Sequence, residues 1–266
     1  MRGWAATRVS GVTARTTALV IAIDGPSGSG KSSVSRAVAK HLDLAYLDTG
    51  AMYRALTWWC VQEGVDLEDQ PAVARAAKEL PLRMGTDPSS PWVKVDDVGI
   101  DDAIRTTEIS ASVSKVATNL GVREELCSRQ RVLIAESVAT SGGVVAEGRD
   151  ITTVVAPGAD VRILMAAHQE ARLARRAKEL HGGADHAAMS ATHDQIVRRD
   201  RDDSTVSEFM EAAPGVTTLD TTFMSFQQSV EAVLVLVATQ TAGTEPDIAL
   251  PEGDRAKAGQ KVRDNG

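Results

Sequence analysis

Five short apolar runs recur along the chain, and segments with helical spacing of apolar residues lie between them. The runs cover residues 19–23, 44–47, 143–147, 161–166 and 216–219. Runs of this length are typical of buried strands. Strands that alternate with helices predict a parallel sheet covered by helices on both faces. The pattern therefore predicts an α/β fold built on a five-stranded parallel sheet.

The segments between the runs predict the helices that cover this sheet. After the first run, Val34, Val38 and Ala39 fall on one helical face. The longest tract, residues 107–140, is expected to form two helices separated at Gly121. Residues 226–238 predict the last amphipathic helix.

Two stretches interrupt the alternation and predict lobes mounted on the main sheet. Residues 66–104 contain four prolines and short alternating pieces, which predict a hairpin-bearing insertion. Residues 168–203 predict two helices with a glycine cap near residue 182, and a mobile helical hairpin of this kind can act as a lid. Both lobes would hang over the carboxyl edge of the sheet.

The two ends of the chain differ in composition from the segment between them. Residues 1–17 combine arginines with serine and threonine and lack an apolar stretch, so we expect a disordered leader rather than a transit peptide. Residues 241–266 are polar and contain glycine and proline, which predicts a disordered tail. Residues 18–240 would then form a single domain.

The overall composition narrows the class of protein. Apolar residues make up 43% and charged residues 24% of the 266 residues, as in soluble globular proteins. No apolar run approaches the ~18 residues that a membrane span needs, and a net charge of −7 argues against nucleic-acid binding. Two cysteines, Cys60 and Cys127, fit a reducing compartment. We therefore expect a cytoplasmic monomer that binds neither membrane nor nucleic acid.

The strongest chemical signal follows the first strand. The residues there are Gly25, Pro26, Ser27, Gly28, Ser29, Gly30, Lys31, Ser32 and Ser33. They fit the pattern G-x-x-x-x-G-K-[ST] between a strand and a helix, in which backbone amides and the helix N-terminus hold a polyphosphate. Lys31 would reach the β- and γ-phosphates, and the Ser32 hydroxyl would bind the Mg²⁺ that accompanies the nucleotide. The chain is thus expected to bind a nucleoside triphosphate.

Polar residues also follow the second and third strands, at the edge where open α/β sheets bind ligands. Thr49 and Arg54 come after the second strand, where Thr49 could equally be a helix N-cap and Arg54 a surface charge. Arg149 and Asp150 come after the third strand. There the arginine can stabilise a transferring phosphoryl group and the carboxylate can orient an acceptor, unless the two simply pair with each other.

Arginines recur in the predicted lid. Arg172, Arg175 and Arg176 are one turn apart, so they can share a helix face and converge on phosphate. Residues 198–203 form a charge run of alternating sign, which is usually a solvated helix face. Because this run follows the predicted lid, a functional role for it is also favoured.

This layout indicates a kinase. Phosphoryl transfer needs an acceptor held in line with the donor, exclusion of water and neutralised phosphate charge, and two arginine-bearing lobes meet these needs. The Asn-Lys-x-Asp motif that reads guanine in GTPases does not occur in the sequence. A motor ATPase usually has a longer chain.

Four motifs make the chain resemble the bacterial cytidylate kinases, which are P-loop nucleoside monophosphate kinases. They are residues 23–33, the Leu-Asp-Thr-Gly-Ala-Met-Tyr-Arg segment at 47–54, Ile-Arg-Thr at 104–106 and Glu-Gly-Arg-Asp-Ile at 147–151. The resemblance covers about residues 20–238 and implies transfer of the ATP γ-phosphoryl group to CMP or dCMP. The products would be ADP and CDP or dCDP, in pyrimidine nucleotide metabolism, with Mg²⁺ as cofactor.

The resemblance also implies a role for individual residues. Those implied to bind the acceptor nucleotide are Thr49, Arg54, Arg105, Ser114, Arg123, Asp150, Arg199 and Asp203. Arg149 is implied to lie near the phosphates, and Arg175 or Arg176 to close on ATP. Lys31, Arg149 and Asp150 are then the candidate catalytic residues.

Two positions depart from the family pattern. Val206 replaces an arginine, so either a neighbour such as Arg201 compensates or turnover is slower, and Thr152 replaces a glycine. We expect activity to survive, because the other arginines and Lys31 remain. The alternatives are a P-loop regulatory protein that has lost kinase activity, and a kinase for another acceptor such as UMP or shikimate.

Overall fold

The computed structural model describes residues 18–181, 200–202, 204–207 and 209–242. The predicted leader, nearly all of the predicted tail and most of the second lid helix lie outside the described residues. Arg199 and Asp203 lie outside them as well. Residues 241 and 242, which were assigned to the tail, instead end and cap the last helix.

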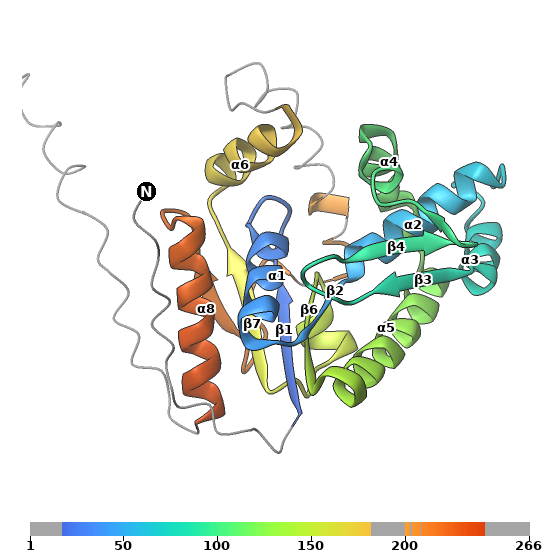
Figure 1. Ribbon diagram of the computed structural model, residues 1–266. Coiled ribbons are helices and arrows are strands. Elements are labelled where there is room, and N and C mark those ends of the chain that lie inside the picture. The colour runs from blue at the N-terminus through green and yellow to red at the C-terminus, as the bar shows by residue number, and fades with distance from the viewer. Residues whose placement is uncertain (1–17, 182–199, 203, 208, 243–266) are drawn as a thin grey trace, which may run out of the picture.

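A five-stranded sheet forms the centre of the molecule (Figure 1). Its strands are β1 (Leu19–Asp24), β2 (Ala45–Asp48), β6 (Gly143–Gly148), β7 (Val161–Ala166) and β8 (Thr217–Asp220). They lie in the order β2-β6-β1-β7-β8, and every neighbouring pair is parallel. Each predicted strand is present within one residue of its expected bounds, which confirms the predicted fold.

Helices cover both faces of this sheet, as expected. On one face, Ile21 and Ile23 pack with helices α1 (Lys31–Leu42) and α8 (Phe226–Thr241). On the other face, Ala22 lies in a cluster with residues of α5 (Leu120–Ser141) and of a π-helical turn at Ile151–Val155. Successive side chains of a strand point to opposite faces, so β1 is buried from both sides.

The predicted insertion contains more than a hairpin. After α2 (Thr49–Gln62) it holds helix α3 (Gln70–Glu79) and an antiparallel sheet of β3 (Leu82–Gly85), β4 (Trp92–Val95) and β5 (Val98–Gly99). A 3-10 turn at Ala103–Arg105 and helix α4 (Thr107–Ala117) follow.

Helix α3 was missed because the insertion is rich in proline. Pro71 lies in the first turn of α3, where its missing N–H would have had no partner in the helix. Asp69 caps this helix and accepts a hydrogen bond from the Ala72 amide at 3.0 Å.

The break in the long helical tract does not lie at Gly121, so that expectation was wrong. Helix α4 ends at Ala117, and Asn119 caps α5 by accepting a hydrogen bond from the Val122 amide at 3.2 Å. Gly121 instead lies inside the first turn of α5. A side chain that binds the free amides of a helix start determined the boundary.

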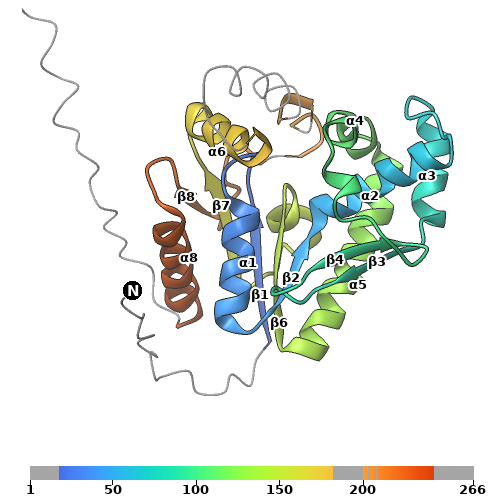
Figure 2. The ribbon, with the colours of Figure 1, turned by 45° about the horizontal axis from the view of Figure 1, so that its top comes forward.

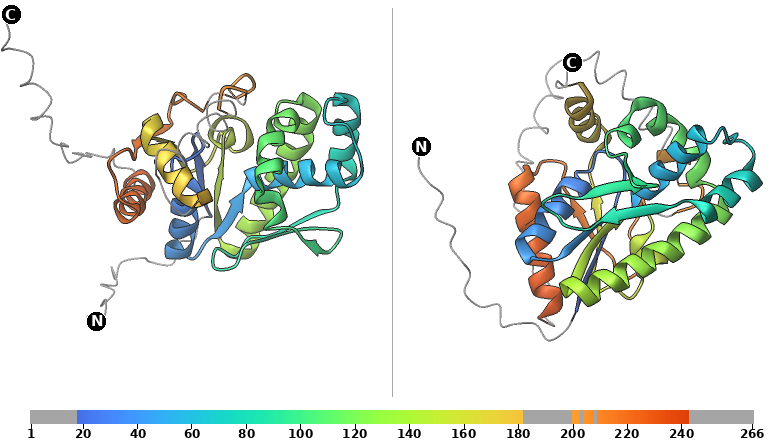
Figure 3. Two further views of the ribbon diagram at one scale, coloured as in Figure 1. Left: turned by 90° about the horizontal axis from the view of Figure 1, so that it is seen from above. Right: turned by 45° about the vertical axis from the view of Figure 1, so that its right-hand side comes forward.

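The insertion and the first lid helix lie on opposite sides of the sheet's carboxyl edge (Figure 3). Helix α6 (Gln169–His181) stands above β7, and the hairpin of β3 and β4 passes in front of the main sheet (Figure 2). Arg36 of α1 donates hydrogen bonds to the carbonyls of Pro88 (2.6 Å) and Ser89 (2.9 Å) and so ties the hairpin to the core. None of the helices in the described part of the chain has the length and apolar content that crossing a bilayer requires.

Candidate active site

A cavity of about 810 Å³ opens at the carboxyl edge of the sheet. Most of the candidate residues line it, namely Ser27, Gly28, Ser29, Gly30, Lys31, Ser32, Ser33, Thr49, Arg54, Arg105, Arg123, Arg149, Asp150, Arg175 and Arg176. Gly25, Pro26 and Ser114 do not line it, although Ser110, Val113 and Ala117 on the same face as Ser114 do. The assignment of Ser114 therefore stays a prediction.

The loop after β1 has a backbone that requires glycine at two points. Gly28 and Gly30 have positive φ angles of 77° and 91°. Residues that carry a Cβ rarely adopt this backbone conformation. A Cβ on Gly28 would also lie 2.5 Å from the Arg172 carbonyl oxygen. Helix α1 begins directly after this loop, so its free N–H groups face the cavity that Lys31 and Ser32 line.

Glu147 lies under this loop, at the end of β6. Its carboxylate is 3.9 Å from the Lys31 ammonium nitrogen, accepts a hydrogen bond from the Tyr46 hydroxyl at 2.8 Å and bonds to the Ser32 hydroxyl. Burial and the nearby Asp48 raise the pKa of Glu147, against the effect of Lys31 and these hydrogen bonds. Glu147 was not among the candidate site residues. Its position at the carboxyl end of a predicted strand could have identified it, because ligands bind at that edge of an open α/β sheet.

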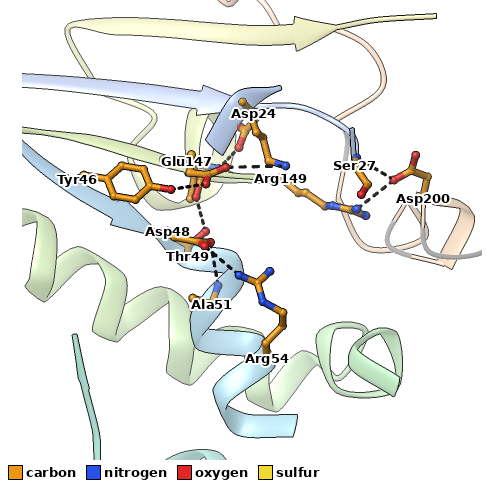
Figure 4. Close-up of polar contacts among 12 residues, drawn as sticks. Asp24, Ser27, Tyr46, Asp48, Thr49, Ala51, Arg54, Glu147, Arg149 and Asp200 are labelled. Atoms are coloured by element: carbon orange, nitrogen blue, oxygen red, sulfur yellow. Dashed lines mark hydrogen bonds and ion pairs between the residues drawn. The ribbon is translucent and has the colours of Figure 1, made fainter. Parts of the chain in front are cut away.

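Asp48 organises the opposite wall of the cavity (Figure 4). It caps α2 by accepting from the Ala51 amide, and it pairs with Arg54 at 2.9 Å and with Arg105 at 3.8 Å. Burial raises the pKa of Asp48, but the charges of Arg54, Arg105 and Lys31 together with the Ala51 hydrogen bond outweigh it, so this pKa is lowered. Both guanidinium groups are thereby held at the cavity wall.

The structure excludes the simpler interpretations of Thr49 and Arg54. The N-cap is Asp48, while the Thr49 hydroxyl donates to the Glu147 carbonyl at 2.7 Å. The Arg54 side chain is only 12% exposed, so it is not a surface charge. Thr49 thus links the start of α2 to β6.

Arg149 and Asp150 pair with other residues. Asp150 is buried and accepts from Arg123 at 2.5 Å, while Arg149 donates to Asp200 at 3.0 Å. Burial raises the pKa of Asp150, and the Arg123 charge opposes this. The Arg123 side chain comes from α5, is only 14% exposed and lines the cavity.

Asp200 closes the other side of the loop after β1. It is buried and accepts from the Ser27 amide at 3.3 Å and from the guanidinium groups of Arg149 and Arg172. The Arg149 guanidinium also stacks on the Phe209 ring, 4.6 Å from its centre. Asp200 was missed because it stands in a charge run that resembles a solvated helix face.

Two arginines of α6 contact this loop, while their predicted convergence on phosphate stays a prediction. Arg172 donates to the Ser27 carbonyl at 3.0 Å, and Arg175 donates to the Ser29 carbonyl at 3.2 Å. Arg172 therefore holds the loop's backbone and is itself buried, while Arg175 and Arg176 line the cavity.

Arg201 does not take the place of the arginine that Val206 replaces. Its side chain is 74% exposed and pairs with the neighbouring Asp202 at 3.3 Å. Of the two alternatives stated for the Val206 departure, compensation by Arg201 has no contact with the cavity-lining residues that the structure describes to support it, and it stays a prediction.

The site fits a divalent cation that is held mainly through phosphate. Ser32 offers a hard oxygen donor at the start of α1, beside a lysine and a carboxylate. Within the described residues, no group of three His, Cys, Asp or Glu side chains could hold a metal ion.

The residues that line the cavity come from all four motifs named above, and a comparison with known proteins identifies the family. Residues 21–239 match the cytidylate kinases. The chain belongs to the cytidylate kinase family. A cytidylate kinase of Streptomyces coelicolor is 45% identical over 228 residues, which cover 85% of this chain and 95% of the relative.

Two further cytidylate kinases give the same result. The one from Cutibacterium acnes is 48% identical over 223 residues, 84% of this chain and 97% of the relative. The one from Streptomyces avermitilis is 42% identical over 226 residues, 85% and 95% of the two chains. Membership of the cytidylate kinase family makes this chain an ATP-dependent phosphotransferase acting on CMP or dCMP, as the motifs predicted.

Proposed function

We propose that the loop after β1 binds ATP and that the facing wall of the same cavity binds CMP or dCMP. The observation that carries this assignment is the single cavity of about 810 Å³, which joins Lys31 and Ser32 to Arg54, Arg105 and Asp150. A phosphate oxygen of CMP would attack the γ-phosphorus of ATP, and the bond from that phosphorus to the β-phosphate oxygen would break, releasing ADP.

Each residue has a defined task in this proposal. Lys31 and Arg149 neutralise the charge that spreads over the γ-phosphoryl oxygens. Arg54 and Arg105, oriented by Asp48, hold the acceptor phosphate so that two anionic groups can approach. Asp150, held by Arg123, orients the acceptor nucleotide.

Mg²⁺ is the proposed cation, and it would be held by the Ser32 hydroxyl together with the phosphates. When bound, it supplies charge neutralisation on the phosphate oxygens. Arg199 and Asp203 remain proposed acceptor contacts, and Arg175 and Arg176 remain proposed ATP contacts. A cytoplasmic location is also proposed, and the two free, buried cysteines support it, since they fit a reducing compartment. A monomer is proposed as well, and light scattering of the purified protein tests it.

A coupled assay that measures ADP production tests the acceptor. CMP, dCMP, UMP, AMP and shikimate are compared at equal concentration, with ATP and Mg²⁺ present. Turnover confined to CMP and dCMP supports the proposal. Binding of ATP without turnover of any acceptor would instead indicate a regulatory protein, and preferred turnover of UMP or shikimate would indicate another kinase.

The Arg54 assignment has a separate prediction. Arg54→Ala should raise the KM for CMP and lower kcat, so that kcat/KM falls about 10- to 150-fold, because one charged hydrogen bond to phosphate is worth ~1.5–3 kcal/mol. The affinity for ATP should change little. Arg75→Ala, an exposed arginine on α3, is the matched control and should resemble the unmodified protein. A loss of ATP affinity alone in Arg54→Ala would show that the residue serves the donor.

A further inference from the structure

Thr152 makes a contact that the glycine of the family pattern could make only in part. This residue is 3% exposed and lies in the π-helical turn at Ile151–Val155. Its hydroxyl donates to Asp24 Oδ2 at 2.6 Å, and its amide donates to the same oxygen at 2.7 Å. Glycine would supply the amide alone.

Asp24 connects two segments of the site. It is 2% exposed, ends β1 and directly precedes the loop that begins at Gly25. Its other oxygen, Oδ1, accepts from the Ile151 amide at 3.0 Å, so the carboxylate receives three hydrogen bonds from the turn after Asp150. The carboxylate therefore joins the proposed ATP loop to the turn that directly follows Arg149 and Asp150.

We infer that Thr152 is a positioning residue for phosphoryl transfer, whose hydroxyl bond to Asp24 sets the placement of Arg149 and Asp150 against the ATP loop. The inference rests on the proposed function of both segments. Thr152 itself does not line the cavity, so it acts through Asp24.

The contact matters because it is buried. A hydrogen bond to a carboxylate is stronger in a low-dielectric interior than at a surface. Alignment of reacting groups is also sensitive to displacements of about 1 Å, which can cost roughly 100-fold in rate. Loss of the hydroxyl should therefore affect the chemical step more than the binding of either nucleotide.

The charge of Asp24 links this contact to pH. Burial raises the pKa of Asp24 to about 6, the Thr152 and Ile151 bonds lower it, and the Asp150 charge raises it further. On the neighbouring strands, Arg162 of β7 donates to the Thr152 carbonyl at 3.3 Å, whereas Glu147 of β6 pairs in register with Ile23 and so points to the opposite face of the sheet from Asp24. Protonated Asp24 would be a poorer acceptor, so the junction loosens in acid.

Thr152→Val tests the inference, because valine keeps the shape and the amide but removes the hydroxyl. We expect kcat with ATP and CMP to fall about tenfold, while both KM values stay within about twofold. Thr152→Ser, which keeps a hydroxyl, should restore kcat to within about twofold. Thr153→Val makes the same change one residue later, at a half-buried position, and is the matched control.

The pH profile separates positioning from a merely structural role. The acid limb of kcat should move upward by about one pH unit in Thr152→Val, because the lost bond stabilised the charged carboxylate. It should not move in Thr153→Val. A Thr152→Val variant that loses only thermal stability, with kcat and acid limb unchanged, would overturn the inference. Failure of the unmodified protein to turn over CMP would instead contradict the proposed function.

Discussion

Four carboxyl groups, the buried Asp24, Glu147 and Asp150 and the half-buried Asp48, lie at or just after the carboxyl ends of strands of the main sheet. Burial raises the pKa of each group, and the pKa of Asp24, Glu147 and Asp150 is raised overall. At Asp48 nearby positive charges and a backbone hydrogen bond outweigh burial. Asp48 is therefore the one of the four whose surroundings favour the charged form, and it holds Arg54 and Arg105 at the acceptor wall.

The raised pKa of Asp24 predicts a pH-dependent contribution to stability. The pKa is 3.8 for the free side chain and about 6 in the fold, so the folded protein binds a proton more tightly between these values. The contribution is then fully present below pH 3.8 and is lost as pH rises to about 6, by up to about 3 kcal/mol.

Urea unfolding at pH 4, 5, 6 and 7 measures this effect when the protein is compared with Asp24→Asn. Asparagine does not titrate, so its changed hydrogen bonds add a constant offset. The free energy of unfolding of the unmodified protein, relative to the variant, should fall between pH 4 and pH 6 and then level off. A difference that is constant across this range would show that Asp24 has an ordinary pKa.

The sequence predicted residues with a motif and missed those whose partners are distant. Lys31, Arg54 and Asp150 stand in recognisable segments, and all three line the cavity. Asp200 meets Ser27 from 173 residues away, and Thr152 meets Asp24 from 128 residues away. No local pattern encodes such contacts, because they arise only when the strands are placed side by side.

At the scale of elements, strands were easier to predict than helix boundaries. A buried strand requires a continuous apolar run, which is visible in the sequence. A helix boundary depends on one capping side chain, as Asp69 and Asn119 illustrate. The proline at the start of α3 and the glycine inside α5 both favoured the wrong interpretation.

Asn119 is accordingly expected to stabilise the junction of α4 and α5. It caps α5 and also donates to the Gln70 carbonyl of α3 at 2.8 Å. Asn119→Ala should lower the free energy of unfolding by about 1–2 kcal/mol, because helix caps contribute this much. Urea unfolding measures it, and Thr118→Ala next to the cap is a control for which a smaller loss is expected. An unchanged stability in Asn119→Ala would contradict the capping role.

At the scale of the whole molecule, the site lies where two apolar cores meet. One core joins β1 to α1 and α8, and the other joins α2 to the insertion and α4. Residues 206 and 207 follow the lid near this junction, and Ser207 lines the cavity. Position 206 precedes this cavity-lining serine in the chain, and the valine there offers no charge.

Val206→Arg should improve the enzyme by restoring the arginine of the family pattern. A charged hydrogen bond of ~1.5–3 kcal/mol to phosphate corresponds to a rise in kcat/KM for CMP of about tenfold or more. Steady-state kinetics at varied CMP concentration measure the change. Val98→Arg, on the exposed strand β5, adds the same charge away from the cavity and should leave kcat/KM unchanged. Equal kinetics for the two variants would show that position 206 does not reach the acceptor.

The order of the strands has a consequence for how such an enzyme can be changed. Strand β2, which leads into the acceptor wall, is the edge of the main sheet, while β1, which leads into the triphosphate loop, is its centre. An edge strand has one neighbour in its sheet, so substitutions and insertions after it disturb fewer contacts. Evolution or a protein engineer can therefore alter the choice of acceptor through the segment between β2 and α4 without changing β1 and the triphosphate loop that follows it.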